Sequence, residues 1–394
     1  MESELSNDPA VQPARIETLA VHAGRSVDPA TGAIVPPIYL STTYERAPNG
    51  NYPLGFAYTT FNNPNRAWLE DAIAEMDGAA AAIATSSGMG AIASVLSQLG
   101  RGERIIVSYD VFQGTARLLN DQVRQWGVEI DVVDITNLDE VEAAITPSTR
   151  MVWIDTPSNP LMRVANITAL ADLAHANNMH VVVDNTFATF VLQRPLSLGA
   201  DVTVYAGTKF IAGHSDVVNG LAVFKEKGEL YDRARAFQIN VGLIPSPFDC
   251  WMVHRGLRTL PHRMRQHSAN AEAIATFLEN HTEVEKVFYP GIPSSEWHTL
   301  ARQQMPAGCG GMMAILVRKG RAAAVRTVAR TKTFTRAASF GGVESLIEHR
   351  ASSPIQMSGQ GTGFVLPDNL LRLSIGIEHV EDLIADLDQA LSGI

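Results

Sequence analysis

The sequence predicts an α/β protein built on a doubly wound, mostly parallel sheet, with a smaller α+β part after it. Short β-branched runs alternate with helical stretches from residue 65 to residue 224. This pattern changes near Pro245–Pro247, after which long helical stretches and short strands follow. Before residue 64, prolines and glycines leave little periodicity, so we expect an extended N-terminal arm there.

These observations divide the chain into an arm (1–63), a main domain (64–247) and a C-terminal α+β domain (248–394). Residues 1–15 are polar and contain two prolines, so we expect them to be disordered. The arm is expected to wrap a neighbouring subunit. Its stretch from Phe56 to Pro64 is rich in aromatic and polar residues that could reach the neighbour's site.

The main domain should begin with a helix over 65–77, capped by Asn65. Another helix, ending at Leu99, should follow the small residues from Ser86 to Gly90. Strands are expected at Arg104–Ser108, Glu129–Val133, Arg150–Ile154, His180–Val183, Val202–Tyr205 and Gly220–Phe224, and helices at Thr115–Trp126 and Leu138–Ala144.

The C-terminal domain should open with one long helix over 248–279. Further strands are expected at Val284–Tyr289, Gly311–Val317, Thr333–Ala338 and Leu370–Ile375, and helices at Ala322–Arg330 and Val380–Leu391.

Composition narrows the possible partners. The 394 residues carry a net charge of −10, which argues against nucleic acid or an anionic membrane surface as the main partner. The two cysteines, Cys250 and Cys309, cannot staple so long a chain, so a reducing cytoplasm is expected, and no metal-type spacing occurs. The longest uncharged run, Gly78–Gly100, contains too many polar residues for a membrane span.

Lys209 and Asp184 each stand at the end of an apolar strand. In open α/β sheets, ligands bind beyond the carboxyl ends of strands, so both side chains should meet in one crevice. Burial lowers the pKa of a lysine and makes its amine a nucleophile able to form a Schiff base. The alternatives are a lysine that reaches solvent at a strand end and an aspartate that caps a turn or helix. Together the two residues are the pair that a pyridoxal phosphate (PLP) site needs.

Two further features favour a binding site. The glycines after Ser87 lie at a helix start, where free N–H groups bind anions, although such a start can also be a plain cap. Arg372 interrupts an apolar strand and needs a partner. It is either an edge-strand side chain in solvent or a clamp for a substrate carboxylate.

Several blocks of sequence are specific. They are Ser86–Met89, Thr156–Pro160, Asp184–Ala188, Thr208–Val218 and Arg255–Leu260. On these blocks the chain resembles the Cys/Met-metabolism family of PLP-dependent enzymes, which includes cystathionine γ-synthase, cystathionine γ-lyase and methionine γ-lyase. The similarity covers nearly the whole chain and implies a PLP-dependent transferase fold of type I.

The resemblance implies a role for each matching residue. Lys209 would form the imine with PLP and move protons, and Asp184 would keep the pyridine nitrogen protonated. Gly88, Met89 and Thr208 would cradle the phosphate, together with Tyr58 from the neighbouring subunit. Phe112 would stack on the ring, Asn159 would contact its oxygen, and Arg372, positioned by Ser339, would bind the substrate carboxylate.

Three positions depart from the family pattern. Thr60 stands where an arginine is usual, and Ala206 replaces a serine, so two phosphate contacts are lost. Phe112 replaces a tyrosine; stacking survives, but the hydroxyl near the leaving group does not. We therefore expect a leaving group that departs unaided or takes its proton from elsewhere.

The expected function is γ-elimination or γ-replacement on an L-amino acid, by a cytoplasmic homodimer that shares its active sites or by a homotetramer. Cystathionine, methionine, O-acyl homoserine and canavanine all stay open as substrates. An aminotransferase on the same fold and a PLP-binding homologue without turnover are the alternatives.

Overall fold

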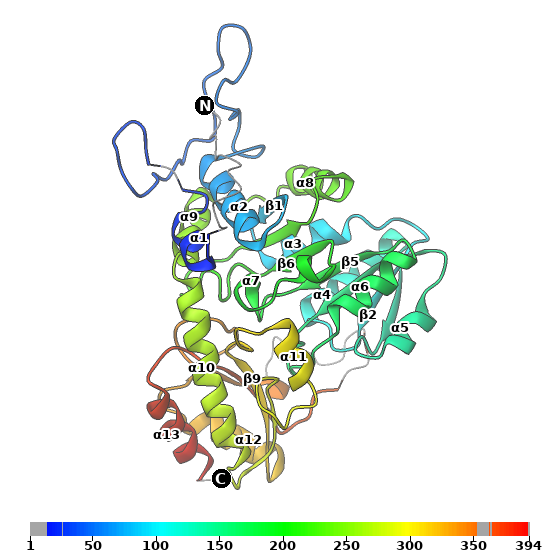
Figure 1. The fold of residues 1–394 in the computed structure, drawn as a ribbon, viewed down its shortest axis with the longest axis vertical. Coiled ribbons are helices and arrows are strands. Elements are labelled where there is room, and N and C mark those ends of the chain that lie inside the picture. Colours follow the sequence, from blue (N-terminus) through cyan, green and yellow to red (C-terminus); the bar gives the residue numbers. More distant parts are fainter. Residues whose placement is uncertain (1–13, 26, 353–361, 363–364, 393–394) are drawn as a thin grey trace.

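The computed structural model describes residues 14–25, 27–352, 362 and 365–392. A seven-stranded sheet forms the upper half of the molecule in Figure 1. Its strands are β1 (Ala81–Thr85), β2 (Arg104–Ser108), β3 (Glu129–Val133), β4 (Thr149–Asp155), β5 (His180–Asp184), β6 (Val202–Tyr205) and β7 (Gly220–Phe224). Their order is β1-β7-β6-β5-β4-β2-β3. Strand β7 is antiparallel to both neighbours, and the pairs from β6 to β3 are parallel. The predicted mostly parallel sheet is confirmed.

Helices cover both faces of this sheet because its strands are apolar on both sides. In β5, Val181 and Val183 join one buried cluster and Val182 joins the other. The first face is covered by α2 (Pro64–Asp77), α5 (Leu138–Ala144) and α6 (Ile167–Ala176), and the second by α3 (Gly88–Leu96), α4 (Gln113–Asp121) and α8 (Glu229–Val241). This double cover is the doubly wound arrangement that the alternating pattern predicts.

A second sheet, of five strands, lies in the lower half of Figure 1. Its strands are β8 (Val284–Phe288), β9 (Met312–Val317), β10 (Thr335–Arg336), β11 (Leu346–His349) and β12 (Leu370–Ser374), in the order β10-β11-β12-β9-β8. Its pairs are antiparallel except β10 with β11. The remaining helices are α1 (Ile16–His22), α7 (Thr189–Leu192), α9 (Pro247–Leu257), α10 (Leu260–Glu279), α11 (His298–Gln304), α12 (Gly320–Arg330) and α13 (Val380–Leu391).

Helix α10 runs along both halves of the molecule (Figure 1). Near its start, Arg263 donates hydrogen bonds to the carbonyl oxygens of Phe210 and Ile211, just after Lys209. Further along, His267 Nδ1 lies 2.7 Å from the carbonyl oxygen of Ile375, and Asn270 donates to that of Gly376. The helix therefore holds the lysine loop of the first half and the end of β12 in the second.

Several predicted elements differ from the observed ones. Asn63, not Asn65, caps α2, and its side chain accepts the N–H of Asn65. The single helix expected over 248–279 is two helices, because Pro261 in the first turn of α10 has no N–H to continue α9. The strand expected at Thr333–Ala338 shrinks to β10, because the carboxylate of Asp386 accepts the N–H groups of residues 332–334.

The arm projects from the first half as the two blue loops at the top of Figure 1. Its base is held by side chains of the main body: Trp251 donates to the carbonyl oxygen of Pro36, and Asn65 bonds the backbone of Pro37 and Tyr39. The segment predicted to be disordered lies mostly outside the described residues, and the division into three domains stays a prediction. In the part of the chain that the structure describes, no helix has the length and apolar character to cross a bilayer.

Candidate active site

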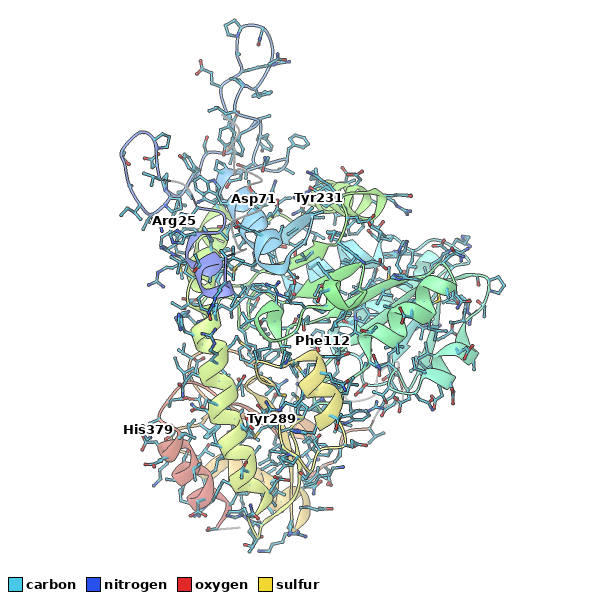
Figure 2. The ribbon with its side chains drawn as sticks, in the orientation of Figure 1. Arg25, Asp71, Phe112, Tyr231, Tyr289 and His379 are labelled. Carbon is cyan, nitrogen blue, oxygen red and sulfur yellow. The ribbon has the colours of Figure 1, made fainter. Side chains whose placement is uncertain are left out.

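A cavity of about 370 Å³ opens at the carboxyl ends of the parallel strands and is closed by segments of the second sheet. It is within the size range of small-molecule sites. Among the predicted site residues, Gly88, Met89, Phe112, Asn159, Asp184, Thr208, Lys209, Ser339 and Arg372 line it. Figure 2 shows Phe112 at mid-height, where the two halves of the molecule meet. A second cavity, of about 340 Å³, lies near Arg150 and His180 at the opposite ends of the strands.

Lys209 lies between the two halves. Its Nζ is 2.6 Å from the Oγ of Ser339 and 4.7 Å from the ring centre of Phe340. Burial, and to a smaller extent the charge of Arg372, lower the pKa of Lys209 to about 8 against the opposing charge of Glu348. The amine is therefore a stronger nucleophile near neutral pH than an ordinary lysine.

The loop after Lys209 is held rigidly. The carbonyl oxygens of Phe210 and Ile211 accept hydrogen bonds from the buried Arg263. Gly213 has a φ of 75°, and a Cβ on it would come within 2.0 Å of Arg263 Nη1. Only glycine fits this close approach, which explains the glycine at position 213.

Asp184 forms the floor of the cavity at the end of β5. Its Oδ1 accepts the backbone N–H of Thr186 at 3.0 Å and the hydroxyl of Thr186 at 2.6 Å. Both bonds reach the same oxygen, so Oδ2 is left for a ligand. Burial raises the pKa of Asp184, and the Thr186 donors oppose this rise. A buried carboxylate of this kind is stabilised by a cation, and a protonated pyridine nitrogen supplies one.

Asp155 is a site residue that the sequence analysis missed. It is the register partner of Asp184 at the end of β4, and its carboxylate accepts the N–H of Phe112 at 2.6 Å and Nε1–H of Trp153 at 2.8 Å. Burial and the neighbouring Asp184 raise its pKa well above the usual range. Asp155 thus fixes the backbone of the residue predicted to stack on the cofactor. The signal was available, because Asp155 closes an apolar strand as Asp184 does.

The start of α3 has the geometry of an anion cradle. Ser87 caps the helix by accepting the N–H of Gly90 at 3.1 Å. The N–H groups of Gly88 and Met89, at the first helical positions, remain for an anion in the cavity. A Cβ on Gly88 would lie 3.0 Å from the Cβ of Ala206, so Ala206 and Gly88 pack tightly at this end.

Thr208 lines the same end of the cavity, but its hydroxyl already has a partner. It donates to the carbonyl oxygen of Asn219 at 3.1 Å and accepts the N–H of Asn219 at 2.9 Å. These bonds join the turn before Lys209 to the start of β7.

Arg372 lies on β12 in the opposite wall and is 4% exposed, which rules out a solvent-facing edge arginine. Its Nη2 donates to Glu348 Oε2 at 2.8 Å and to the carbonyl oxygen of Ser339 at 2.9 Å. Its Nη1 is 3.4 Å from the Oδ1 of Asn159. Ser339 therefore contacts both Lys209 and Arg372, and it does so with a left-handed φ of 83°. Such strain in a non-glycine residue is found most often at functional sites.

Tyr58 does not line this cavity. It lies on the arm with 48% of its surface exposed and forms an isolated bridge with Thr43. The backbone carbonyl of Thr60 accepts a hydrogen bond from the buried Arg66 at 3.3 Å. Tyr58 is thus exposed on the arm, whereas Thr60 is half-buried and held against the start of α2.

The model of a family described as Cys/Met metabolism PLP-dependent enzyme matches residues 17–392. The chain belongs to this family. It is 46% identical over 375 residues to a cystathionine gamma-synthase of Mycobacterium tuberculosis, with 95% of this chain and 96% of the relative covered. It is 42% identical to a cystathionine gamma-lyase of Bos taurus, with 95% and 93% covered. The solved structure of a cystathionine gamma synthase from Xanthomonas oryzae pv. oryzae, in complex with aminoacrylate and cysteine, superposes with a TM-score of 0.92 at 40% identity and covers 97% of this chain and 98% of that one.

Family membership confirms the predicted resemblance, the fold, PLP as the cofactor and the enzyme class, a PLP-dependent lyase or transferase. The residues present fit this cofactor, since a buried carboxylate, a nucleophilic lysine and a helix N-terminus face one cavity. The roles of the individual site residues stay predictions.

Proposed function

We propose that the chain carries out γ-elimination or γ-replacement on an L-amino acid with a leaving group on its γ-carbon. One observation carries this proposal: Lys209, with its lowered pKa, lies between Asp184 on one wall of the cavity and Arg372 on the other. The three groups supply a nucleophilic amine, a partner for a ring nitrogen and a partner for a carboxylate.

PLP, held by Lys209, Asp184 and the N-terminus of α3, supplies an electron sink when bound. Arg372 binds the substrate's carboxylate and thereby fixes its α-carbon near Lys209. The amine of Lys209 takes the α-proton and returns protons within the site, and the Ser339 hydroxyl 2.6 Å away keeps this amine in place. Phe112 offers an apolar face without a proton donor, which favours a leaving group that needs none from this position.

The choice of substrate is tested by a panel that contains cystathionine, methionine, an O-acyl homoserine and canavanine. Each is incubated with the holoenzyme, and 2-oxo acid, ammonia and product masses are measured. The proposal expects catalytic turnover with at least one member of the panel. Conversion of the cofactor to its amine form with one equivalent of oxo acid would instead show transamination. No turnover with any γ-substituted amino acid would contradict the proposal.

We also propose a homodimer with shared active sites, paired into a tetramer in the cytoplasm. The arm supports this assembly, because Leu40 is 71% exposed, Leu54 83% and Phe61 60%, more apolar surface than a free arm favours. In this dimer Tyr58 reaches the partner's phosphate site.

Mixing subunits tests the sharing of sites. A subunit with Lys209→Ala and a subunit with Tyr58→Ala should each be weakly active or inactive alone. In a hybrid dimer one site regains both native residues, so mixing should restore activity. If activity after subunit exchange stays at the level of the separate variants, the sites are not shared.

A further inference from the structure

The cavity contains a second buried arginine that the predicted roles do not use. Arg350 follows β11 directly, lines the cavity and is 2% exposed. Among the described residues its ionic partner is Glu348, with Nη1 3.7 Å from Oε2. Its Nε is buried and has no hydrogen-bond partner in the part of the chain that the structure describes. The guanidinium of Arg350 is therefore buried with one long ion pair. Because a poorly compensated buried charge is strongly destabilising, a functional reason for this arginine is expected.

Glu348 is shared between two arginines. It is the register neighbour of Arg372 across β11 and β12, and the same oxygen, Oε2, is 2.8 Å from Arg372 Nη2. The three residues are at most 7% exposed. Two positive charges therefore face one negative charge, and the buried group carries a net charge of +1.

This net charge matters for binding a carboxylate. Without Arg350, Arg372 and Glu348 would form a neutral pair, and an entering substrate carboxylate would leave one negative charge buried. With Arg350, the same carboxylate brings the group to neutrality. In a water-poor site, where charges interact more strongly than in solvent, the second arrangement is strongly favoured.

We propose that Arg350 is a positioning residue of the substrate-carboxylate site. It balances the charge of Glu348, so that Arg372 keeps its attraction for the substrate. The Oε2 of Glu348 accepts a hydrogen bond from the guanidinium of Arg372 across the two strands, a contact that the amide oxygen of a glutamine would retain. This inference rests on the proposed role of Arg372.

Binding of an amino acid without a γ-leaving group separates this effect from turnover. The holoenzyme is titrated with L-norvaline, and the dissociation constant is read from the change in visible absorbance. Norvalinamide, which lacks the carboxylate charge, serves as the matched ligand. Arg350→Met should weaken L-norvaline binding at least about tenfold, as expected for the loss of one charge a few ångströms away. Norvalinamide binding should change less than about twofold, a difference that a general structural defect would not produce.

A double variant tests how Arg350 acts. Glu348→Gln combined with Arg350→Met restores a net charge of +1, so L-norvaline affinity should return to within about threefold of wild type. Arg350→Lys, which keeps the charge, should also bind L-norvaline well. Unchanged affinity in Arg350→Met, or no recovery in the double variant, would overturn the inference.

Two controls keep the test decisive. If Arg350→Met does not fold, Glu348→Gln alone is used; it raises the net charge to +2 and should tighten L-norvaline binding, and weaker binding would contradict the inference. Failure of the proposed function would be visible in wild type, as no turnover with any γ-substituted amino acid of the panel. Failure of the Arg350 inference would be visible only in the variants.

Discussion

The two walls of the cavity hold their charges in different ways. The first-sheet wall carries Asp155, Asp184 and Lys209, and neighbours in the sequence or in the sheet orient the two carboxylates. The second-sheet wall carries Arg350 and Arg372, which share Glu348 across two strands. The first wall is suited to a bound cofactor and the second to an exchangeable carboxylate. Variants of the first wall should alter the bound cofactor, and variants of the second should weaken substrate binding while the cofactor stays bound.

The largest effect is expected for Lys209→Ala. Turnover should fall at least about 10³-fold, because the site loses its nucleophile and its base. The visible band of the lysine-bound cofactor should disappear with it. Lys286→Ala, an exposed lysine on β8, is the control and should keep both. Normal turnover in Lys209→Ala would remove the basis for assigning the chemistry to the first-sheet wall.

Arg372→Met should affect substrate binding but not the cofactor. The KM should rise about 10²-fold, since a charge-assisted clamp is lost and Glu348 keeps only Arg350. The visible band of the holoenzyme should be unchanged. Arg336→Met, an exposed arginine on β10, is the matched control. A loss of cofactor in Arg372→Met would show that the two walls do not have separate roles.

The pKa of Lys209 links the two walls. Because burial lowers this pKa to about 8, the free amine should already predominate above that pH in the cofactor-free protein. The rate at which added PLP forms the visible band should therefore rise with pH and level off above about 8. In Arg372→Met the midpoint should move upward, since the charge of Arg372 is one cause of the lowering. A rate that keeps rising to pH 10 would indicate an ordinary lysine.

Asp155→Asn should lower the free energy of unfolding by about 1–3 kcal/mol. An amide presents one acceptor oxygen where two N–H donors, from Phe112 and Trp153, now point. Denaturant unfolding measures the change, with Asp172→Asn on the exposed face of α6 as the control. Equal stability of the two variants would mean that Asp155 does not anchor Phe112.

The smallest effect is expected for Phe112→Tyr. Stacking is retained, and the new hydroxyl can donate a proton to a leaving group, so substrates with basic leaving groups should gain relative to the others by less than about 10²-fold. Ratios of kcat/KM across the substrate panel measure this gain. An unchanged profile would mean that the missing hydroxyl does not tune specificity.

The first-sheet wall was largely predictable from the sequence. Each of its groups follows an apolar strand, and parallel strands bring their carboxyl ends to one edge, so Asp184 and Lys209 could be placed together without a structure. The strands Glu129–Val133, Val202–Tyr205 and Gly220–Phe224 match the predicted bounds. Asp155 follows the same rule, because it closes β4 beside Asp184.

Of the charged residues of the second-sheet wall, only Arg372 was predictable from the sequence. Strand β11, which carries Glu348, was not expected, because its charged and polar residues hide the apolar alternation. The strand expected at 333–338 was largely wrong, since the deciding contact comes from Asp386 on α13, far along the chain. No pattern in the sequence marks Arg350 as a site residue. Its proposed role follows only from the pairing of β11 with β12, which brings Arg350 and Arg372 to the carboxylate of Glu348.

Helix α10 is hydrogen-bonded to both walls of the cavity. At about 1.5 Å of rise per residue its 20 residues span roughly 30 Å. Its Arg263 hydrogen-bonds the loop that follows Lys209, and its His267 hydrogen-bonds the end of the strand that carries Arg372. This one helix thus fixes the distance between the two walls of the substrate site. A substitution that bends the helix would lower activity without altering any residue that contacts the substrate.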